Sequence, residues 1–144
     1  MSTTVSVIIG DDDPLVREAL LALLRDDARL SVVGIASSGD DATQLVSELQ
    51  PAVAVLDLRM PSGGAEGIRS VRAASPRTRV VVLSAYDDVV TATEALRAGA
   101  VGFLPKGRLS HDLPEALVRC AAGELVVDID VGPEVLAEIS RARG

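Results

Sequence analysis

Polar side chains follow four apolar segments of this sequence, at positions where they could do chemistry. Asp11 and Asp12 follow the first such segment, Asp57 and Ser84 close two later ones, and Lys106 lies just past the last. Two carboxylates about 4 Å apart repel each other by roughly 4 kcal/mol at an effective dielectric constant near 20. A hard divalent cation offsets that repulsion, and Mg²⁺ suits a site with few protein ligands. If these side chains converge, they predict a magnesium site to which Lys106 adds positive charge.

Other kinds of reactive site are excluded. The chain has one histidine, His111, and one cysteine, Cys120, in no paired arrangement, which argues against a catalytic triad. The segment 10–14 lacks the later glycines of a dinucleotide-binding loop and the lysine of a P-loop. The remaining chemistry is attack by the Asp57 carboxylate on a phosphoryl group, with Mg²⁺, Ser84 and Lys106 neutralising charge on the transferring oxygens.

The segments that would position these residues alternate between two patterns. Apolar, β-branched runs of strand length occur at 5–9, 31–35, 53–56, 80–83 and 101–104. Between and after them lie stretches with helical spacing of apolar residues, including 65–73 and 90–98. Strand–helix–strand connections are right-handed and parallel, so five units predict an α/β fold, a doubly wound five-stranded parallel sheet with helices on both faces. Ligands bind such sheets beyond the carboxyl ends of the strands, where the polar residues would meet.

The C-terminal part continues past this alternation. A fifth helix is expected from Ser110 or Asp112 to Gly123, with Glu115 at the position of a capping box. Residues 125–130 are expected to be extended or turn-like, and 133–141 to form a further amphipathic helix. That helix is additional to a five-unit sheet.

Composition and charge define the class of protein. The 144 residues are 48% hydrophobic and 24% charged, which suits one globular domain. The net charge of −7 repels phosphate backbones and predicts a poor DNA binder. There is no bilayer-spanning apolar run, no secretory signal at the N-terminus, and too few cysteines for an internal disulfide. We therefore expect a cytoplasmic protein.

Four ordered motifs resemble those of the receiver domains of bacterial two-component response regulators. They are Asp11-Asp12, Asp57-Leu58-Arg59-Met60-Pro61, Ser84-Ala85 and Phe103-Leu104-Pro105-Lys106, and the resemblance runs from Val5 to about Gly123. It implies a flavodoxin-like strand order 2-1-3-4-5. It also implies a signalling switch that accepts a phosphoryl group from a sensor histidine kinase and catalyses its own phosphorylation and dephosphorylation, rather than a conventional enzyme.

The same resemblance implies roles for individual residues. Asp57 would be the phosphoacceptor, and Ser84 and Lys106 would contact the phosphoryl group. The magnesium ligands would be Asp11, Asp12, Asp57 and the backbone carbonyl of Arg59. Phe103 matches the aromatic switch position of the family.

Phosphorylation of Asp57 would add about −1.5 to −2 charges and three acceptor oxygens. Two charged hydrogen bonds, from Ser84 and Lys106, supply roughly 3 to 6 kcal/mol, against about 5.5 kcal/mol needed to carry a two-state equilibrium from 1:99 to 99:1. We expect Ser84 to move inward and Phe103 to turn into the vacated space. The surface of the fourth helix, fifth strand and fifth helix would then change and control partners, including a homodimer through the first and fifth helices.

The segments 98–106 and 118–128 resemble the subfamily whose receivers precede a LuxR-type helix-turn-helix domain. We therefore expect residues 1–124 to form the receiver domain. Residues 125–144 would form a linker with the additional helix, leading to a DNA-binding domain absent from this chain. Either a fragment of a longer transcription regulator or a freestanding receiver fits this pattern.

Two other functions stay open. One is a receiver-like interaction module that never accepts phosphate. The other is an aspartate-based phosphatase, although that class normally has a second acid where this sequence has Arg59. Arg59 and Tyr86 also flank the path of water toward Asp57, so we expect their bulk and the Arg59 charge to lengthen the lifetime of an acyl phosphate.

Overall fold

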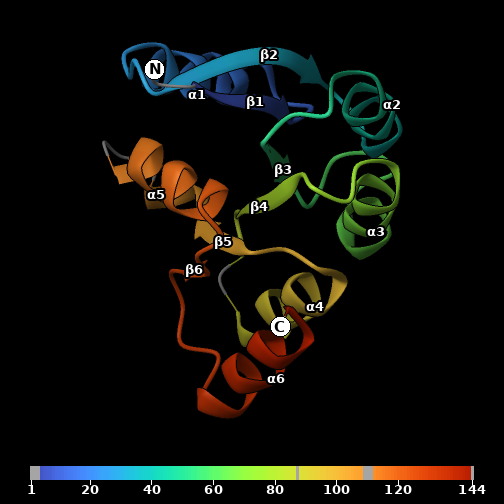
Figure 1. Ribbon diagram of the computed structural model, residues 1–144, viewed down its shortest axis with the longest axis vertical. Helices are drawn as coiled ribbons and strands as arrows, with labels where there is room; N and C mark the ends of the chain where they lie inside the picture. The colour runs from blue at the N-terminus through green and yellow to red at the C-terminus, as the bar shows by residue number, and fades with distance from the viewer. Residues whose placement is uncertain (1–3, 87, 109–111, 144) are drawn as a thin grey trace.

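The computed structural model describes residues 4–86, 88–108 and 112–143 as a three-layered α/β molecule (Figure 1). Its strands are β1 (Val5–Gly10), β2 (Leu30–Ala36), β3 (Val53–Asp57), β4 (Arg79–Ser84), β5 (Gly102–Pro105) and β6 (Val126–Val127). Its helices are α1 (Pro14–Arg25), α2 (Gly39–Leu49), α3 (Gly64–Ala74), α4 (Val89–Ala98), α5 (Asp112–Ala121) and α6 (Pro133–Arg143), with a short 3₁₀ turn, η1, at Lys106–Arg108. Among the described residues, none of the helices has the length and apolar character needed to cross a bilayer.

The strands form one parallel sheet in the order β2-β1-β3-β4-β5-β6. The predicted five-stranded core and its order are confirmed. The predicted number of strands is one too few, because residues 126–127, expected only to be extended or turn-like, pair with β5. The backbone amide of Val126 donates to the Val101 carbonyl at 2.9 Å, and that of Asp128 donates to the Phe103 carbonyl at 2.9 Å.

Side chains of the strands alternate between two cores, one on each face of the sheet. Val55 and Val81 belong to the core formed with α1 and α5, whereas Ala54 and Val82 belong to the core formed with α2, α3 and α4. Both faces are covered (Figure 1), which is why these strands are continuously apolar in sequence. Phe103 on β5 is fully buried in the second core.

Helix boundaries follow local capping. An Asp13 carboxylate oxygen accepts a hydrogen bond from the Leu15 amide and caps α1, as its position before a first-turn proline predicts. Helix α4 begins one residue earlier than expected because Asp88 caps it, and it ends at Gly99 with φ of 116°. Helix α5 begins at Asp112, while the alternative start at Ser110 lies outside the described residues, as does His111.

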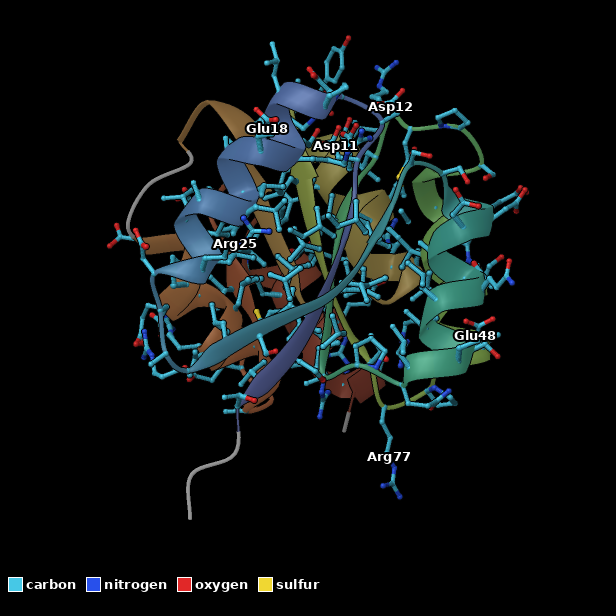
Figure 2. All side chains as sticks on the ribbon, turned by 90° about the horizontal axis from the view of Figure 1, so that it is seen from above. Asp11, Asp12, Glu18, Arg25, Glu48 and Arg77 are labelled. Atoms are coloured by element: carbon cyan, nitrogen blue, oxygen red, sulfur yellow. The ribbon has the colours of Figure 1, made fainter. Side chains whose placement is uncertain are left out.

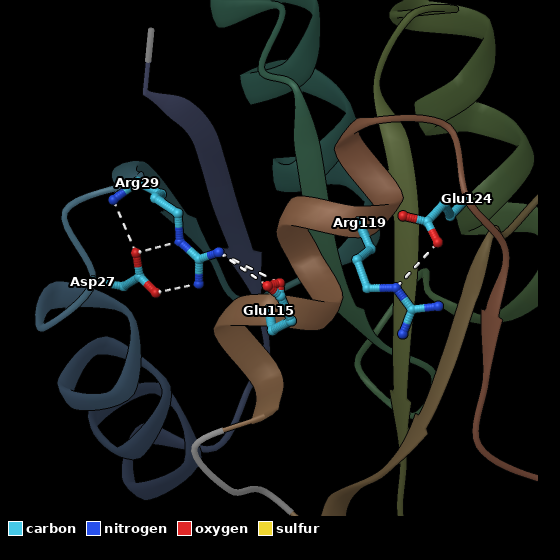
Figure 3. A network of polar contacts seen from close by, with 5 residues as sticks. All are labelled: Asp27, Arg29, Glu115, Arg119 and Glu124. Atoms are coloured by element: carbon cyan, nitrogen blue, oxygen red, sulfur yellow. Dashed lines mark hydrogen bonds and ion pairs between the residues drawn. The ribbon is translucent and has the colours of Figure 1, made fainter. Parts of the chain in front are cut away.

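Surface ion pairs tie α5 to its neighbours (Figure 3). Arg29, in the loop before β2, pairs with Asp27 at 2.8 Å and with Glu115 of α5 at 3.0 Å. The carboxylate expected to form a capping box is thus paired with a guanidinium from another element. Arg119 pairs with Glu124 at 3.1 Å just after α5 ends.

Helix α6 packs against α4 and extends the second core. Val131 and Ile139 are buried, and each contributes roughly 2 kcal/mol of apolar burial. Arg97 of α4 donates two hydrogen bonds to the Glu138 carboxylate of α6, at 2.8 and 3.0 Å. The segment expected to be a linker is therefore docked on the body of the molecule.

Candidate functional site

Two acidic residues lie where β1 ends and the chain turns into α1. Figure 2 places Asp11 and Asp12 at one end of the molecule and Arg77 at the opposite end. Asp11 is 1% exposed and Asp12 is exposed. One Asp11 carboxylate oxygen accepts from the Asp13 amide at 2.9 Å, which fixes the side chain under the loop.

Asp57, the last residue of β3, lies beside this pair. It is 4% exposed, and its Oδ1 accepts from the Arg59 amide at 3.3 Å. Carboxylate oxygens of Asp11, Asp12 and Asp57 all lie within 4.8 Å of one another. Because β1 and β3 are adjacent parallel strands, their carboxyl ends bring these acids together. The predicted convergence of the three carboxylates is therefore present.

Lys106 supplies positive charge to the same cluster from the turn after β5. Its Nζ lies 3.0 Å from Asp11 Oδ2 and 3.3 Å from Asp57 Oδ1. Apart from this ion pair, Asp11 Oδ2 has no hydrogen-bond donor within the described part of the chain, although it is buried. An acceptor oxygen with spare capacity beside two more carboxylates is a donor set that fits Mg²⁺.

The buried carboxylates of the cluster repel each other. Burial raises the pKa of Asp57, and the Asp11 charge raises it further, outweighing the Arg59 amide and Lys106, which lower it. Burial by itself would lower the pKa of Lys106, but its hydrogen bonds and charge interactions with Asp11 and Asp57 raise it. One ammonium thus offsets only part of the repulsion between the carboxylates.

Ser84 ends β4, the next strand in the sheet, and is buried. Its hydroxyl donates to the Tyr86 carbonyl at 2.8 Å and accepts from the Tyr86 amide at 2.9 Å. The Ser84 hydroxyl is therefore hydrogen-bonded within its own loop. It can contact a phosphoryl group on Asp57 only if that loop rearranges.

Arg59 and Tyr86 stack across the site. The Arg59 guanidinium carbon lies 4.0 Å from the centroid of the Tyr86 ring, a cation–π contact between the loops after β3 and β4. That Arg59 and Tyr86 flank the path of water toward Asp57 stays a prediction, to which the structure adds their contact with each other.

Phe103 lies on β5 with its ring fully buried in the second core. The structure is that of the unmodified chain, so the turn of Phe103 into space vacated by Ser84 stays a prediction. Any such turn would take place inside this core, against its packing neighbours.

The loop after Asp57 is fixed by α2. The Gly39 amide donates to the Pro61 carbonyl at 2.7 Å, and the Asp40 amide donates to the Ser62 hydroxyl at 2.8 Å. A Cβ at Gly39 would lie 1.7 Å from the Ser62 carbonyl oxygen, so only glycine permits this approach. The turn after β3 is therefore anchored to the start of α2.

Sequence reasoning missed Arg17. Its guanidinium donates to the Asp11 backbone carbonyl at 2.8 Å, fastening the acidic loop to α1. A cation near the start of a helix interacts unfavourably with the helix dipole. An arginine at this position therefore indicates that a specific contact compensates, and this signal could have been used.

The comparisons with known proteins agree with this geometry. Residues 7–118 match the family model for the response regulator receiver domain. The chain is 40% identical over 124 residues to the "Probable transcriptional regulatory protein NarL" of Mycobacterium tuberculosis (strain CDC 1551 / Oshkosh), covering 85% of this chain and 57% of that protein.

Two solved structures share the fold. The signal receiver domain of NarL from Mycobacterium tuberculosis superposes with a TM-score of 0.80 at 38% identity, covering 84% of this chain and 98% of that one. A LuxR-family two-component response regulator from Aurantimonas sp. SI85-9A1 gives 0.82 at 28% identity, covering 98% and 99%. The chain spans about three-fifths of the length of the curated relatives it matches. With its fold, its ordered strand-end motifs and the match over most of its length, this chain belongs to the receiver domain family of two-component response regulators.

Proposed function

We propose that this receiver accepts a phosphoryl group on Asp57 from a sensor histidine kinase, and that Mg²⁺, Ser84 and Lys106 assist the transfer. The observation that carries the proposal is the convergence of three carboxylates and Lys106 at the carboxyl end of the sheet. Such a cluster is costly to fold and is explained by the charge it can bind.

The transfer is a displacement at phosphorus. A carboxylate oxygen of Asp57 forms a bond to phosphorus while the bond from phosphorus to the donor, a histidine nitrogen or the carboxyl oxygen of acetyl phosphate, breaks. The donor leaves with that bond's electron pair. Lys106, already in contact with Asp57, compensates charge on the transferring oxygens.

Magnesium would be held by Asp11, Asp12 and Asp57, together with the Arg59 backbone carbonyl. When bound, Mg²⁺ neutralises charge on the phosphoryl oxygens. The protein's own part is to hold the acids in place, through the Asp13 amide on Asp11 and the Arg59 amide on Asp57.

Hydrolysis of the acyl phosphate returns the switch to its starting state. Water must approach phosphorus opposite the Asp57 oxygen, between the loops that carry Arg59 and Tyr86. Arg59 and Tyr86 stack on each other, and we propose that the stacked pair restricts this approach and slows autodephosphorylation.

The output is proposed to be transcriptional. Relatives with up to 40% identity are named transcriptional regulatory proteins and are longer than this chain. With a net charge of −7, residues 1–144 would reach DNA only through an effector domain outside them, and 125–144 would lead to it from the receiver of 1–124. Phosphorylation would also favour a homodimer.

Incubation with Mg²⁺ and acetyl phosphate, followed by intact-mass measurement, tests the proposal. We expect one added phosphoryl group in the parent, none in Asp57→Ala, and none when EDTA replaces Mg²⁺. A folded parent that stays unmodified would be a silent interaction module. Repeated turnover of small phosphate esters without lasting acylation would instead identify a phosphatase.

A further inference from the structure

Helix α6 covers part of the surface that a receiver would change on phosphorylation. It lies beside α4 (Figure 1), joined to it by the Arg97–Glu138 pair and by Ile139, which is 4% exposed. While α6 occupies this position, another molecule cannot bind the same face of α4. Helix α6 thus covers a face of α4 that a partner could otherwise bind.

The attachment of α6 is small enough to be reversible. Apart from Val131 and Ile139, the apolar residues that α6 and its approach contribute to this core are only partly buried. The Arg97–Glu138 pair is solvent-exposed, and exposed pairs contribute little. A pocket of about 460 Å³ also lies between α6 and the ends of α3 and α4, lined by Arg72, Arg97, Glu138 and Ile139 among others.

The opposite end of α4 is connected to Ser84. The Ser84 hydroxyl holds both backbone groups of Tyr86, and Asp88, two residues later, caps α4. If Ser84 turns toward a phosphoryl group on Asp57, both hydrogen bonds to Tyr86 break and the start of α4 is released. The helix spans only Val89–Ala98, so displacement at one end reaches Arg97 at the other.

A second connection runs through β5 and β6. The Asp128 amide donates to the carbonyl of Phe103, and Lys106 of the site follows the same strand. Between β6 and α6 the chain turns at Gly132, whose φ is 89° and whose amide donates to an Asp130 carboxylate oxygen. If α6 left α4, it would swing about this turn while β6 stayed paired.

We propose that α6 is a latch that phosphorylation releases. In the unmodified chain it docks on α4, and phosphorylation of Asp57 shifts α4 and lowers the occupancy of the docked position. The proposal rests on the phosphoacceptor function of Asp57. The coupling is reciprocal: if a phosphoryl group on Asp57 weakens the docking of α6 by a certain factor, docking of α6 weakens binding at the phosphoryl site by the same factor.

Hydrogen–deuterium exchange on samples of known phosphorylation tests the latch. Intact mass first establishes the extent of modification after acetyl phosphate and Mg²⁺. We expect amides 135–142 to exchange at least tenfold faster in the phosphorylated protein, while amides in β1 and β3 stay protected.

Substitutions on α6 separate docking from general loosening. Ile139→Asp should undock the helix and give fast exchange with or without phosphate. Leu136→Asp, at an exposed position of the same helix, should behave as the parent. Glu138→Arg should raise exchange about threefold, and combination with Arg97→Glu should restore protection. If Ile139→Asp fails to fold, Glu138→Arg and its combination with Arg97→Glu still test the docking of α6.

Beryllofluoride, a phosphoryl analogue, tests the reciprocal effect. Ile139→Asp should bind it with Mg²⁺ more tightly than the parent, by up to the factor by which phosphorylation accelerates α6 exchange. Glu138→Arg, which undocks α6 less, should show a smaller gain of at most about threefold. Modified protein with unchanged α6 protection would overturn the latch and leave the phosphoacceptor function intact. An unmodified Asp57 would remove both.

Discussion

At the scale of single residues, Asp57 meets two opposing demands. It must be buried to exclude water from the reaction, yet it must be ionised to attack phosphorus. Burial and the Asp11 charge raise its pKa, so folding favours its protonated form. Its contribution to stability is fully present below the ordinary aspartate pKa and is lost as pH rises through the raised value.

Asp57→Asn should therefore stabilise the metal-free protein at neutral pH. Removing one of the clustered charges while keeping the shape should raise Tm by a few °C, at about 3 °C per kcal/mol for a domain of this size. Thermal melts in EDTA between pH 4 and 8 measure the effect, and the gap between variant and parent should close toward acid pH. An equal gap at every pH would contradict the ionisation argument.

Arg59 and Tyr86 should set the lifetime of the phosphorylated state. Replacing both, as Arg59→Asn with Tyr86→Ala, removes the stacked pair and should accelerate loss of the phosphoryl group about tenfold. Phosphorylated samples freed of donor can be followed by intact mass over time. Matching decay rates in parent and variant would eliminate this role.

Arg17 should support the metal site without touching the metal. Arg17→Met frees the Asp11 carbonyl from its guanidinium partner, and the affinity for Mg²⁺ should fall about fivefold, or ~1 kcal/mol. Isothermal titration calorimetry measures this directly. Arg25→Met, at the opposite end of the same helix, is the matched control and should leave Mg²⁺ affinity unchanged.

At the scale of elements, the site depends on contacts between loops and helix ends. The turn after β3 is pressed against the start of α2, where Gly39 leaves no room for a side chain. Gly39→Ala should destabilise the protein by about 2 kcal/mol through displacement of that turn. Urea unfolding monitors the change, with Gly107→Ala as control because open space surrounds Gly107. Equal midpoints for both variants would refute the close approach.

At the scale of the whole molecule, Mg²⁺ should act as a stabilising ligand. A ligand that binds only the folded state contributes about 2.7 kcal/mol at a hundred times its Kd. The Tm should rise accordingly on adding Mg²⁺ and return on adding EDTA. Asp12→Asn should lose most of this rise while keeping the metal-free Tm, because Asp12 is exposed. A Tm independent of Mg²⁺ would argue against a metal site.

The sequence by itself determined the order of strands and helices, the faces they bury, and the acids and lysine at the strand ends. These follow from local patterns, since apolar periodicity and the direction of parallel strands decide which residues share an edge. The cap of α1 at Asp13 and the end of α4 at Gly99 also follow from local sequence, because an aspartate before a proline favours a helix start and a glycine favours a helix end.

Only the tertiary structure decided the pairing of β6 with β5, the docking of α6 on α4, and the full burial of Phe103. It also decided the contacts of Arg17 and of Arg59 with Tyr86. Each joins residues whose neighbourhood depends on how separate elements pack. A local pattern records that a helix forms and which face is apolar, but not which surface that face will meet.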